Sequence, residues 1–303
     1  MATATGTVRF THSVSTPGPA QGMSFTGRRR EAGEGEPAAG TPLIIAVHGG
    51  TYTSAYFDVP GHSLLDRAAA AGVPVIAIDR PSYGGSSPVA KGGPDSVILE
   101  NAEALDHLAA ELWVRFGTGT AGVVLVGHSI GGAVVIATAA RTPSWPLLGI
   151  AVSGCLLQVP KEQLAAFGEL PDTPARMPQQ IKDAVMFGPP GTYEAHMPQA
   201  SHRSDAPTPP AELIDINTSW PQRVRSVAAQ VTVPVHSRQG EFDRLWLTDT
   251  RQVEEFGAAF RAAPHVDARL VRSAGHCVDF HRAGAGFQLA QLAFAFDCCV
   301  PAP

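Results

Sequence analysis

The stretch VVLVGHSIGG, residues 123–132, decides the fold. Its four leading apolar residues, Val123–Val126, are typical of a strand buried on both faces. The small, apolar stretch Gly132–Arg141 predicts a buried helix directly afterwards. Between them, Gly127–Gly131 matches the pattern G-x-S-x-G in the strand–turn–helix context that this pattern requires. Glycines on both sides of Ser129 relieve the crowding of a sharp turn, so we expect its hydroxyl to stand clear of the sheet as a nucleophile.

The rest of the chain alternates between short apolar runs and longer amphipathic ones, which predicts an α/β fold with a mostly parallel sheet and helices on both of its faces. Two half-buried strands that form a hairpin are expected to precede the sheet. The expected strands are 7–14, 23–29, 43–47, 75–78, 123–126, 148–152, 231–235 and 268–271. The expected helices are 61–71, 96–116, 132–141, 249–262 and 286–296.

One segment, Cys155–Arg225, interrupts this alternation. It has no strong strand signal and is rich in proline, methionine and aromatic residues. A structureless loop of this length is improbable within a compact domain. We therefore predict a core domain formed by residues 1–154 and 226–303, with an inserted, mostly helical cap at residues 155–225.

A serine nucleophile needs a base, and the base needs an orienting acid. His276 follows the last predicted strand, and loops at the carboxyl ends of strands hold the site in open α/β sheets. The acid is expected after the preceding strand, where Asp243 is the prediction and Glu241 the alternative. His281 is read as a surface or supporting group. The order Ser129, Asp243, His276 is the one typical of α/β-hydrolases.

An oxyanion hole requires two backbone N–H groups that point at the substrate oxygen. One is expected from Ile130, which follows the nucleophile. The other is expected from the turn that follows Val47, with Gly50 as the donor and Thr51 as the alternative. His48 is expected to brace this loop, and His128 to lie beneath or beside the nucleophile.

Composition excludes several other classes. The chain has 303 residues, of which 44% are hydrophobic, and a net charge of −5. The hydrophobic content excludes a wholly disordered chain. The negative net charge does not favour binding to nucleic acid or to an anionic membrane. We see no secretory signal and no run of 18 apolar residues, and the four cysteines are too few for a disulfide framework. We therefore expect a cytoplasmic protein. The charged, glycine-bearing stretch Arg28–Pro37 predicts an exposed loop.

No cofactor and no metal are expected. Gly117–Gly122 satisfies G-x-G-x-x-G but precedes a strand instead of following one, so it lacks the geometry that cradles phosphates. His196, His202 and Asp205 lack the spacing of metal ligands.

These motifs together resemble the α/β-hydrolase superfamily in its cap-bearing, esterase-like branch. The resemblance covers most of the chain and rests on five motifs in order: HGG at His48, DRPSYGGS at Asp79, GHSIG around Ser129, GEFD ending at Asp243, and AGH ending at His276. Ser82 stands where glycine is usual in this family. The resemblance implies a hydrolase with a Ser129–His276–Asp243 triad, whose cap shapes the substrate pocket.

We therefore expect a serine hydrolase, either a carboxylic ester hydrolase or a thioesterase, that acts through an acyl-enzyme. The alternatives are C–C hydrolysis, lactone hydrolysis, perhydrolysis or acyl transfer by the same triad, and a non-catalytic ligand-binding protein. Ser129 argues against an epoxide hydrolase or dehalogenase, which carry Asp at this turn. The methionines and aromatics of the cap favour a small-molecule substrate with an apolar or aromatic acyl group.

Candidate substrate-binding residues lie in the predicted turns and the cap. They are Thr51, Tyr52, His128, Met186, Phe187, Tyr193 and Trp220. The last predicted helix carries Leu289, Leu292, Phe294 and Phe296, which face either the protein's own core or a second copy in a homodimer.

Overall fold

A computed structural model describes residues 6–32, 40–89, 96–162, 173–174 and 176–300 of the chain. Its described residues form one eight-stranded mixed sheet in the order β1-β2-β4-β3-β5-β6-β7-β8. β1 and β2 form an antiparallel hairpin, β2 pairs antiparallel with β4, and every other pair is parallel. The strands are β1 (Val8–Ser13), β2 (Ser24–Arg30), β3 (Leu43–Val47), β4 (Val75–Ile78), β5 (Val123–His128), β6 (Leu147–Ser153), β7 (Val235–Gly240) and β8 (Val266–Val271). The predicted α/β-hydrolase fold is confirmed.

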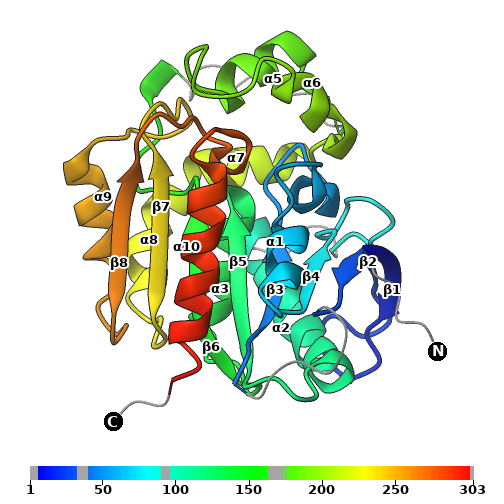
Figure 1. Cartoon of the computed structure of the whole chain (residues 1–303). Coiled ribbons are helices and arrows are strands. Elements are labelled where there is room, and N and C mark those ends of the chain that lie inside the picture. Colours follow the sequence, from blue (N-terminus) through cyan, green and yellow to red (C-terminus); the bar gives the residue numbers. More distant parts are fainter. Residues whose placement is uncertain (1–5, 33–39, 90–95, 163–172, 175, 301–303) are drawn as a thin grey trace.

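Helices cover both faces of the sheet (Figure 1). The alternation of side chains along each strand builds two apolar layers. In β3, Leu43, Ile45 and Val47 belong to one layer, whereas Ile44 and Ala46 belong to the other. All five side chains are fully buried, as an unbroken apolar run predicts. The first layer packs against α2 (Val97–Phe116), α3 (Ile130–Ala139), α8 (Trp220–Ala228) and α9 (Thr250–Gly257), and the second against α1 (Leu64–Ala70) and α10 (Gly284–Asp297).

Polar side chains fix where two of the predicted helices begin. Ser63 precedes α1 and accepts a hydrogen bond from the N–H of Asp66, with 3.0 Å between the two heavy atoms. Asp249 precedes α9 and accepts from the N–H of Gln252 at 2.7 Å. Such caps satisfy N–H groups that have no partner within the helix.

One strand lies further along the chain than its apolar run predicts. The prediction was 231–235, whereas β7 spans Val235–Gly240. Pro234 has no N–H to donate, so the ladder begins after it. Most of β7 is polar yet buried, including His236, Ser237 and Gln239. A strand whose buried residues are polar contains no apolar run, so an apolar pattern in the sequence does not indicate it.

The segment predicted as a cap carries four helices and one short 3₁₀ turn among its described residues, namely α5 (Gln179–Met186), α6 (Met197–Ser201), η2 (His202–Ser204), α7 (Pro210–Thr218) and α8. α5 and α6 lie above one end of the sheet (Figure 1). α8 instead packs against α3 within the first layer. The predicted cap boundary at Arg225 therefore falls inside a helix that covers the sheet, and residues 163–172 and 175 lie outside the described part.

The surface shows two further outcomes of the sequence predictions. In α10, Leu292 and Phe294 are buried in the second layer, whereas the Leu289 side chain is exposed, so this helix mainly faces its own core. Arg28–Arg30, expected in an exposed loop, instead end β2, and residues 33–37 of that stretch lie outside the described part.

Within the described ranges, none of the helices has the length and apolar character needed to cross a bilayer.

Candidate active site

The nucleophile candidate lies on a strained turn between β5 and α3. Ser129 has φ 55° and ψ −122°, a combination that L-residues rarely adopt. Its N–H donates to the carbonyl of Ser153 at the end of β6, at 2.8 Å. A Cβ on Gly131 would lie 2.2 Å from the Val47 carbonyl oxygen, so only glycine allows the helix to approach β3 this closely. The turn that the motif predicts is therefore present.

His276 and Asp243 lie together, although they are far apart in sequence. The Nδ1 of His276 lies 2.7 Å from the Asp243 Oδ2, and both side chains are buried. A carboxylate can only accept, so Nδ1 carries a proton, and in the neutral imidazole Nε2 keeps its lone pair. Asp243 Oδ1 also accepts from the N–H of Leu245 at 2.8 Å, and Gln239 donates to Oδ2. These contacts hold the carboxylate in one orientation.

The end of β6 contacts both Ser129 and His276. Ser153 binds the N–H of Ser129, and the next residue, Gly154, is so close to the imidazole that a Cβ would lie 3.0 Å from the His276 Cε1. His128, which directly precedes Ser129, has its ring centroid 4.9 Å from that of His276. Burial lowers the pKa of His128 well below its usual value, with His276 and His48 adding to the effect, so His128 is neutral at pH 7.

Glu241, the alternative to Asp243, lies on the surface and is directed elsewhere. Its Oε2 accepts from the N–H of Ser273 at 2.9 Å. His281, read as a surface or supporting group, is fully buried. Its Nε2 accepts from the N–H groups of Gly275 and Gly188 at 2.9 and 3.0 Å. It therefore ties the loop that carries His276 to the chain that follows α5.

The turn after β3 lies against Ser129. A Cβ on Gly49 would lie 2.8 Å from the Ser129 Cβ, and one on Gly50 would lie 3.0 Å from the Ile130 Cδ1. The N–H of Thr51 donates to the Thr208 Oγ1 at 2.7 Å and is therefore already occupied. His48 braces the turn, because its Nδ1 donates to the Gly49 carbonyl at 2.7 Å and its Nε2 accepts from the N–H of Arg80 at 3.0 Å. Burial, aided by Arg80, lowers the pKa of His48 to about 3.

A small, mainly apolar cavity of about 50 Å³ opens beside Ser129. Most of its lining comes from the turn after β3, the cap helix α7 and the loop after Asp243. The lining residues are Gly50, Thr51, Ser129, Ile130, Met177, Met186, Leu213, Ile216, Asn217, Leu245 and Trp246. Of the candidate substrate-binding residues, Thr51 and Met186 are therefore at this cavity.

The structure does not bring the other candidates to the lining of this cavity. Trp220 is buried in the first layer, where α8 packs on the sheet. Phe187 and Tyr193 pack against each other, with ring centroids 4.9 Å apart. Tyr52 is buried with its hydroxyl 3.3 Å from the Cys277 Sγ. His128 lies beneath the turn, and its ring is stacked on that of Tyr56 with the two ring centroids 4.6 Å apart. Aromatic content alone does not reveal which side chains face a cavity, and these positions are used for packing.

A buried ion pair that the sequence did not suggest joins the turn after β3 to the cap. Arg80 and Glu212 are each about 1% exposed, with Nη1–Oε1 at 2.7 Å and Nη2–Oε2 at 3.0 Å. Arg80 Nε also donates to the His48 carbonyl at 2.7 Å. The Tyr83 hydroxyl donates to the Glu212 Oε2 at 2.8 Å. Since Glu212 lies on α7, the pair connects one wall of the cavity to the turn that carries Gly50.

A metal site is not found in the part of the chain that the structure describes, where no three His, Cys, Asp or Glu side chains gather as ligands would. Of the residues considered for a metal, His202 instead lies 3.0 Å from the Asp183 carboxylate, and Asp205 pairs with Lys182.

Known structures share this architecture at low sequence identity. E-2-(acetamidomethylene)succinate hydrolase is 17% identical, with a TM-score of 0.68 over 96% of this chain and 100% of that one. An esterase from Thermogutta terrifontis is 16% identical, with a TM-score of 0.62 over 97% and 100%. The N-acyl homoserine lactonase AidH, complexed with N-butanoyl homoserine, is 20% identical, with a TM-score of 0.60 over 93% and 96%.

No protein of curated function matches the sequence. The sequence does match the model of the alpha/beta hydrolase family over residues 44–287, which is most of the chain and includes Ser129, Asp243 and His276. The chain therefore belongs to the alpha/beta hydrolase family.

Proposed function

We propose that the protein is a serine hydrolase that cleaves carboxylic esters or thioesters of short, apolar acyl groups. The observation that carries this proposal is the buried 2.7 Å hydrogen bond between His276 Nδ1 and Asp243, formed beside the strained turn of Ser129. That bond leaves Nε2 as the base for a serine hydroxyl, which is otherwise a weak nucleophile. Membership of the family and the likeness to an esterase and a lactonase agree with this chemistry.

In the proposed reaction, the Ser129 Oγ attacks the carbonyl carbon and its proton passes to the His276 Nε2. The negative charge then develops on the carbonyl oxygen. The N–H of Ile130 is suited to stabilise it, because the first residue of a helix has no partner for this group within the helix. Gly50 is the better second donor, since Thr208 already occupies the N–H of Thr51.

The tetrahedral intermediate collapses when the bond to the leaving alcohol or thiol breaks, and His276 returns the proton to that group. A water molecule then attacks the acyl-enzyme carbonyl and gives its proton to Nε2. The second intermediate collapses to the free acid, and Ser129 regains its proton. No group other than water is needed to balance these steps.

The acyl group is proposed from the cavity. Its volume of about 50 Å³ and its lining by Leu213, Ile216 and Met186 fit a short aliphatic chain. Trp246 is the aromatic member of this lining, whereas the aromatic residues expected from the cap sequence pack elsewhere. This favours an aliphatic over an aromatic acyl group.

A hydrolysis series tests the proposal. The purified protein is assayed with p-nitrophenyl acetate, butyrate and octanoate and with the matching thioesters, and the free acid is quantified. We expect kcat/KM to fall by at least tenfold from butyrate to octanoate. The proposal is contradicted if the folded protein hydrolyses none of them, or if the acyl group is recovered on an added alcohol instead of as free acid.

A variant of the cavity wall tests the chain-length argument separately. Ile216→Ala removes three carbon atoms from the lining and should raise the octanoate-to-butyrate ratio of kcat/KM at least threefold. Leu289→Ala, an exposed position on α10, is the matched control and should leave the ratio unchanged. An unchanged ratio in Ile216→Ala would show that this wall does not limit the acyl group.

A further inference from the structure

A second cavity, with a volume of about 540 Å³, lies between the β1–β2 hairpin, the 3₁₀ helix η1 (Ser54–Asp58) and η2 of the cap. It shares no lining residue with the cavity beside Ser129. Three arginines line it, namely Arg9 from β1, Arg28 from β2 and Arg203 from η2. The proposed hydrolysis uses none of them.

Arg9 and Arg28 are direct partners across the antiparallel pair β1–β2. Side chains in this relation share one face of the sheet, and like charges placed directly opposite each other are destabilising. Arg28 is partly compensated by Asp58, with Nη1–Oδ2 at 3.3 Å. The Arg9 side chain is exposed, and its guanidinium makes no hydrogen bond or ion pair with the residues that the structure describes. The hairpin therefore concentrates positive charge at this cavity without a compensating group for Arg9.

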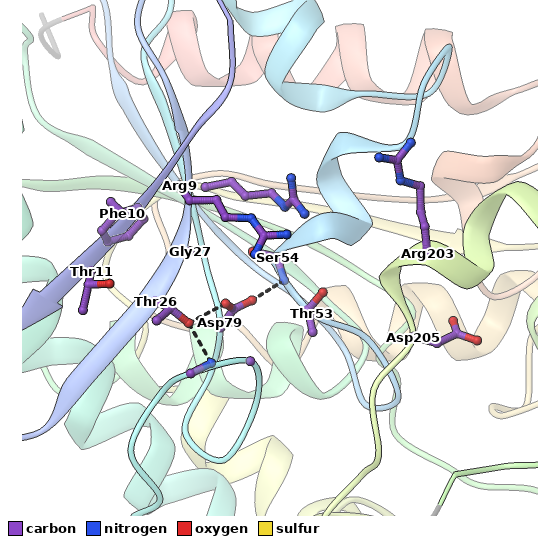
Figure 2. A pocket seen from close by; sticks show the side chains of 13 residues that line it. Arg9, Phe10, Thr11, Thr26, Gly27, Thr53, Ser54, Asp79, Arg203 and Asp205 are labelled. Atoms are coloured by element: carbon purple, nitrogen blue, oxygen red, sulfur yellow. Dashed lines mark hydrogen bonds between the residues drawn. The ribbon is translucent and has the colours of Figure 1, made fainter.

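Arg203 adds a third guanidinium from the cap. It too is exposed and has no ion-pair or hydrogen-bond partner within the described ranges. In Figure 2, Arg9 and Thr26 extend from the hairpin, and Arg203 and Asp205 belong to the segment on the other side of the view. The charges thus come from two separate parts of the fold and face a common space.

The carboxylates at this cavity are already engaged. Asp79 accepts from the Thr26 hydroxyl at 2.6 Å and from the N–H of Ser54 at 2.6 Å, as Figure 2 shows. Asp205 pairs with Lys182 of α5 and accepts from Gln179 at 3.1 Å. Neither carboxylate is bonded to Arg9 or Arg203, so the two guanidiniums keep their donors for a ligand.

We propose that this cavity binds the phosphoryl group of a small molecule. Guanidinium groups present planar pairs of N–H donors that match phosphate oxygens, and charge-assisted bonds of this kind are the strong ones. A dianion compensates the charges of Arg9 and Arg203 together. It also relieves the repulsion between Arg9 and Arg28, which gives the cross-strand pair a function. This inference does not depend on the proposed hydrolysis.

Binding is measured by isothermal titration calorimetry, and the melting temperature is followed in parallel, at an ionic strength kept constant with chloride. The ligands are inorganic phosphate, glycerol 3-phosphate and succinate. We expect saturable binding of one or both phosphoryl compounds, with weaker binding of succinate. Arg9→Gln and Arg203→Gln should each raise the Kd about tenfold, the loss expected for a charged hydrogen bond. Arg251→Gln, an exposed arginine on α9, is the control and should not change it.

The ligand-free proteins give a second readout. Arg9→Gln removes one of two positive charges that face each other across the strand pair, so the melting temperature of this variant should exceed that of the wild type. The proposal is overturned if neither phosphoryl compound binds saturably, if succinate binds as tightly, or if Arg9→Gln and Arg203→Gln bind like Arg251→Gln. Vesicles that contain phosphatidic acid form the last arm, and binding to these alone would contradict a small-molecule ligand.

Discussion

Arg80 and Glu212 form a bidentate ion pair in the protein interior, with N–O distances of 2.7 and 3.0 Å. Burial lowers the pKa of Arg80, but Glu212 and Tyr83 together more than offset this, so its pKa is raised and the guanidinium stays charged. The same guanidinium donates to the carbonyls of His48 and Gly49, at 2.7 and 3.3 Å. The pair therefore fixes the turn of the proposed oxyanion hole relative to α7, which lines the cavity beside Ser129.

Glu212→Gln should reduce both stability and activity. The neutral amide leaves the buried Arg80 charge without its partner, which costs about 3 kcal/mol of unfolding free energy. Urea unfolding measures this change. We expect kcat to fall at least tenfold while KM changes little, because the turn that carries Gly50 loses its support.

The double variant Arg80→Met/Glu212→Leu separates positioning from simple destabilisation. Apolar replacement of a buried pair is often neutral or stabilising, so most of the lost stability should return. The activity should not return, because the donors to the His48 and Gly49 carbonyls are gone. Recovery of full activity in the double variant would contradict a positioning role.

Asp243→Asn should abolish most of the hydrolysis. An amide in this place no longer selects the tautomer with its proton on His276 Nδ1, and kcat should fall roughly 10³–10⁴-fold. Glu241→Gln is the matched control and should stay within about threefold of the wild type, since Glu241 bonds to Ser273 instead. The reverse pattern in steady-state rates would transfer the acid role to Glu241.

Gly49→Ala should impair the reaction through geometry. The new Cβ would lie 2.8 Å from the Ser129 Cβ, so either the turn or the nucleophile must move. A displacement of about 1 Å at a reacting group can cost 10²-fold in rate, and we expect a loss of this size in kcat/KM. In Gly50→Ala the added Cβ meets the flexible end of Ile130, so the loss should be smaller. Equal losses in the two variants would contradict this reading of the turn.

His236 should contribute to acid sensitivity of the fold. Its ring is buried in β7 with both nitrogens unpartnered among the described residues, and burial, aided by Arg238, lowers its pKa to about 3. In the unfolded chain the pKa returns to about 6.5. The stabilising contribution is therefore present above about pH 6.5 and declines as the pH falls towards 3, because the unfolded state binds a proton that the folded state does not.

His236→Phe removes this proton uptake and keeps a ring of similar size. Between about pH 5.5 and 4, the slope of the unfolding free energy against pH should decrease by up to about 1.4 kcal/mol per unit. Urea titrations at fixed pH values measure the slope. An unchanged slope would show that His236 is protonated in the folded state.

The central sheet could be predicted because its strands are simple in composition. Leu43–Val47 and Val123–Val126 are buried on both faces and read as unbroken apolar runs. The prediction for β7 lies too early in the sequence, because the buried side chains of this strand are mainly polar. A glycine-flanked serine between a strand and a helix is likewise a local signal, which is why the turn at Ser129 could be recognised.

The cap and the cavity could not be predicted in the same way. The wall formed by Leu213 and Ile216 depends on how α7 docks, and long-range contacts hold that helix. One is the contact of Glu212 with Arg80, more than a hundred positions away in sequence. Aromatic residues are typical of binding pockets, but here they pack against other side chains, as Phe187, Tyr193 and Trp220 do. Long-range contacts of this kind leave no periodic pattern in a single sequence.

The central claim is that Ser129 is the nucleophile, and labelling by a fluorophosphonate probe tests it most directly. The wild-type protein should be labelled stoichiometrically, with the adduct on Ser129 in mass spectra of the digested protein. Ser129→Ala should remain unlabelled while keeping the wild-type circular dichroism spectrum. An unlabelled but folded wild-type protein, or an adduct on another residue, would contradict the account.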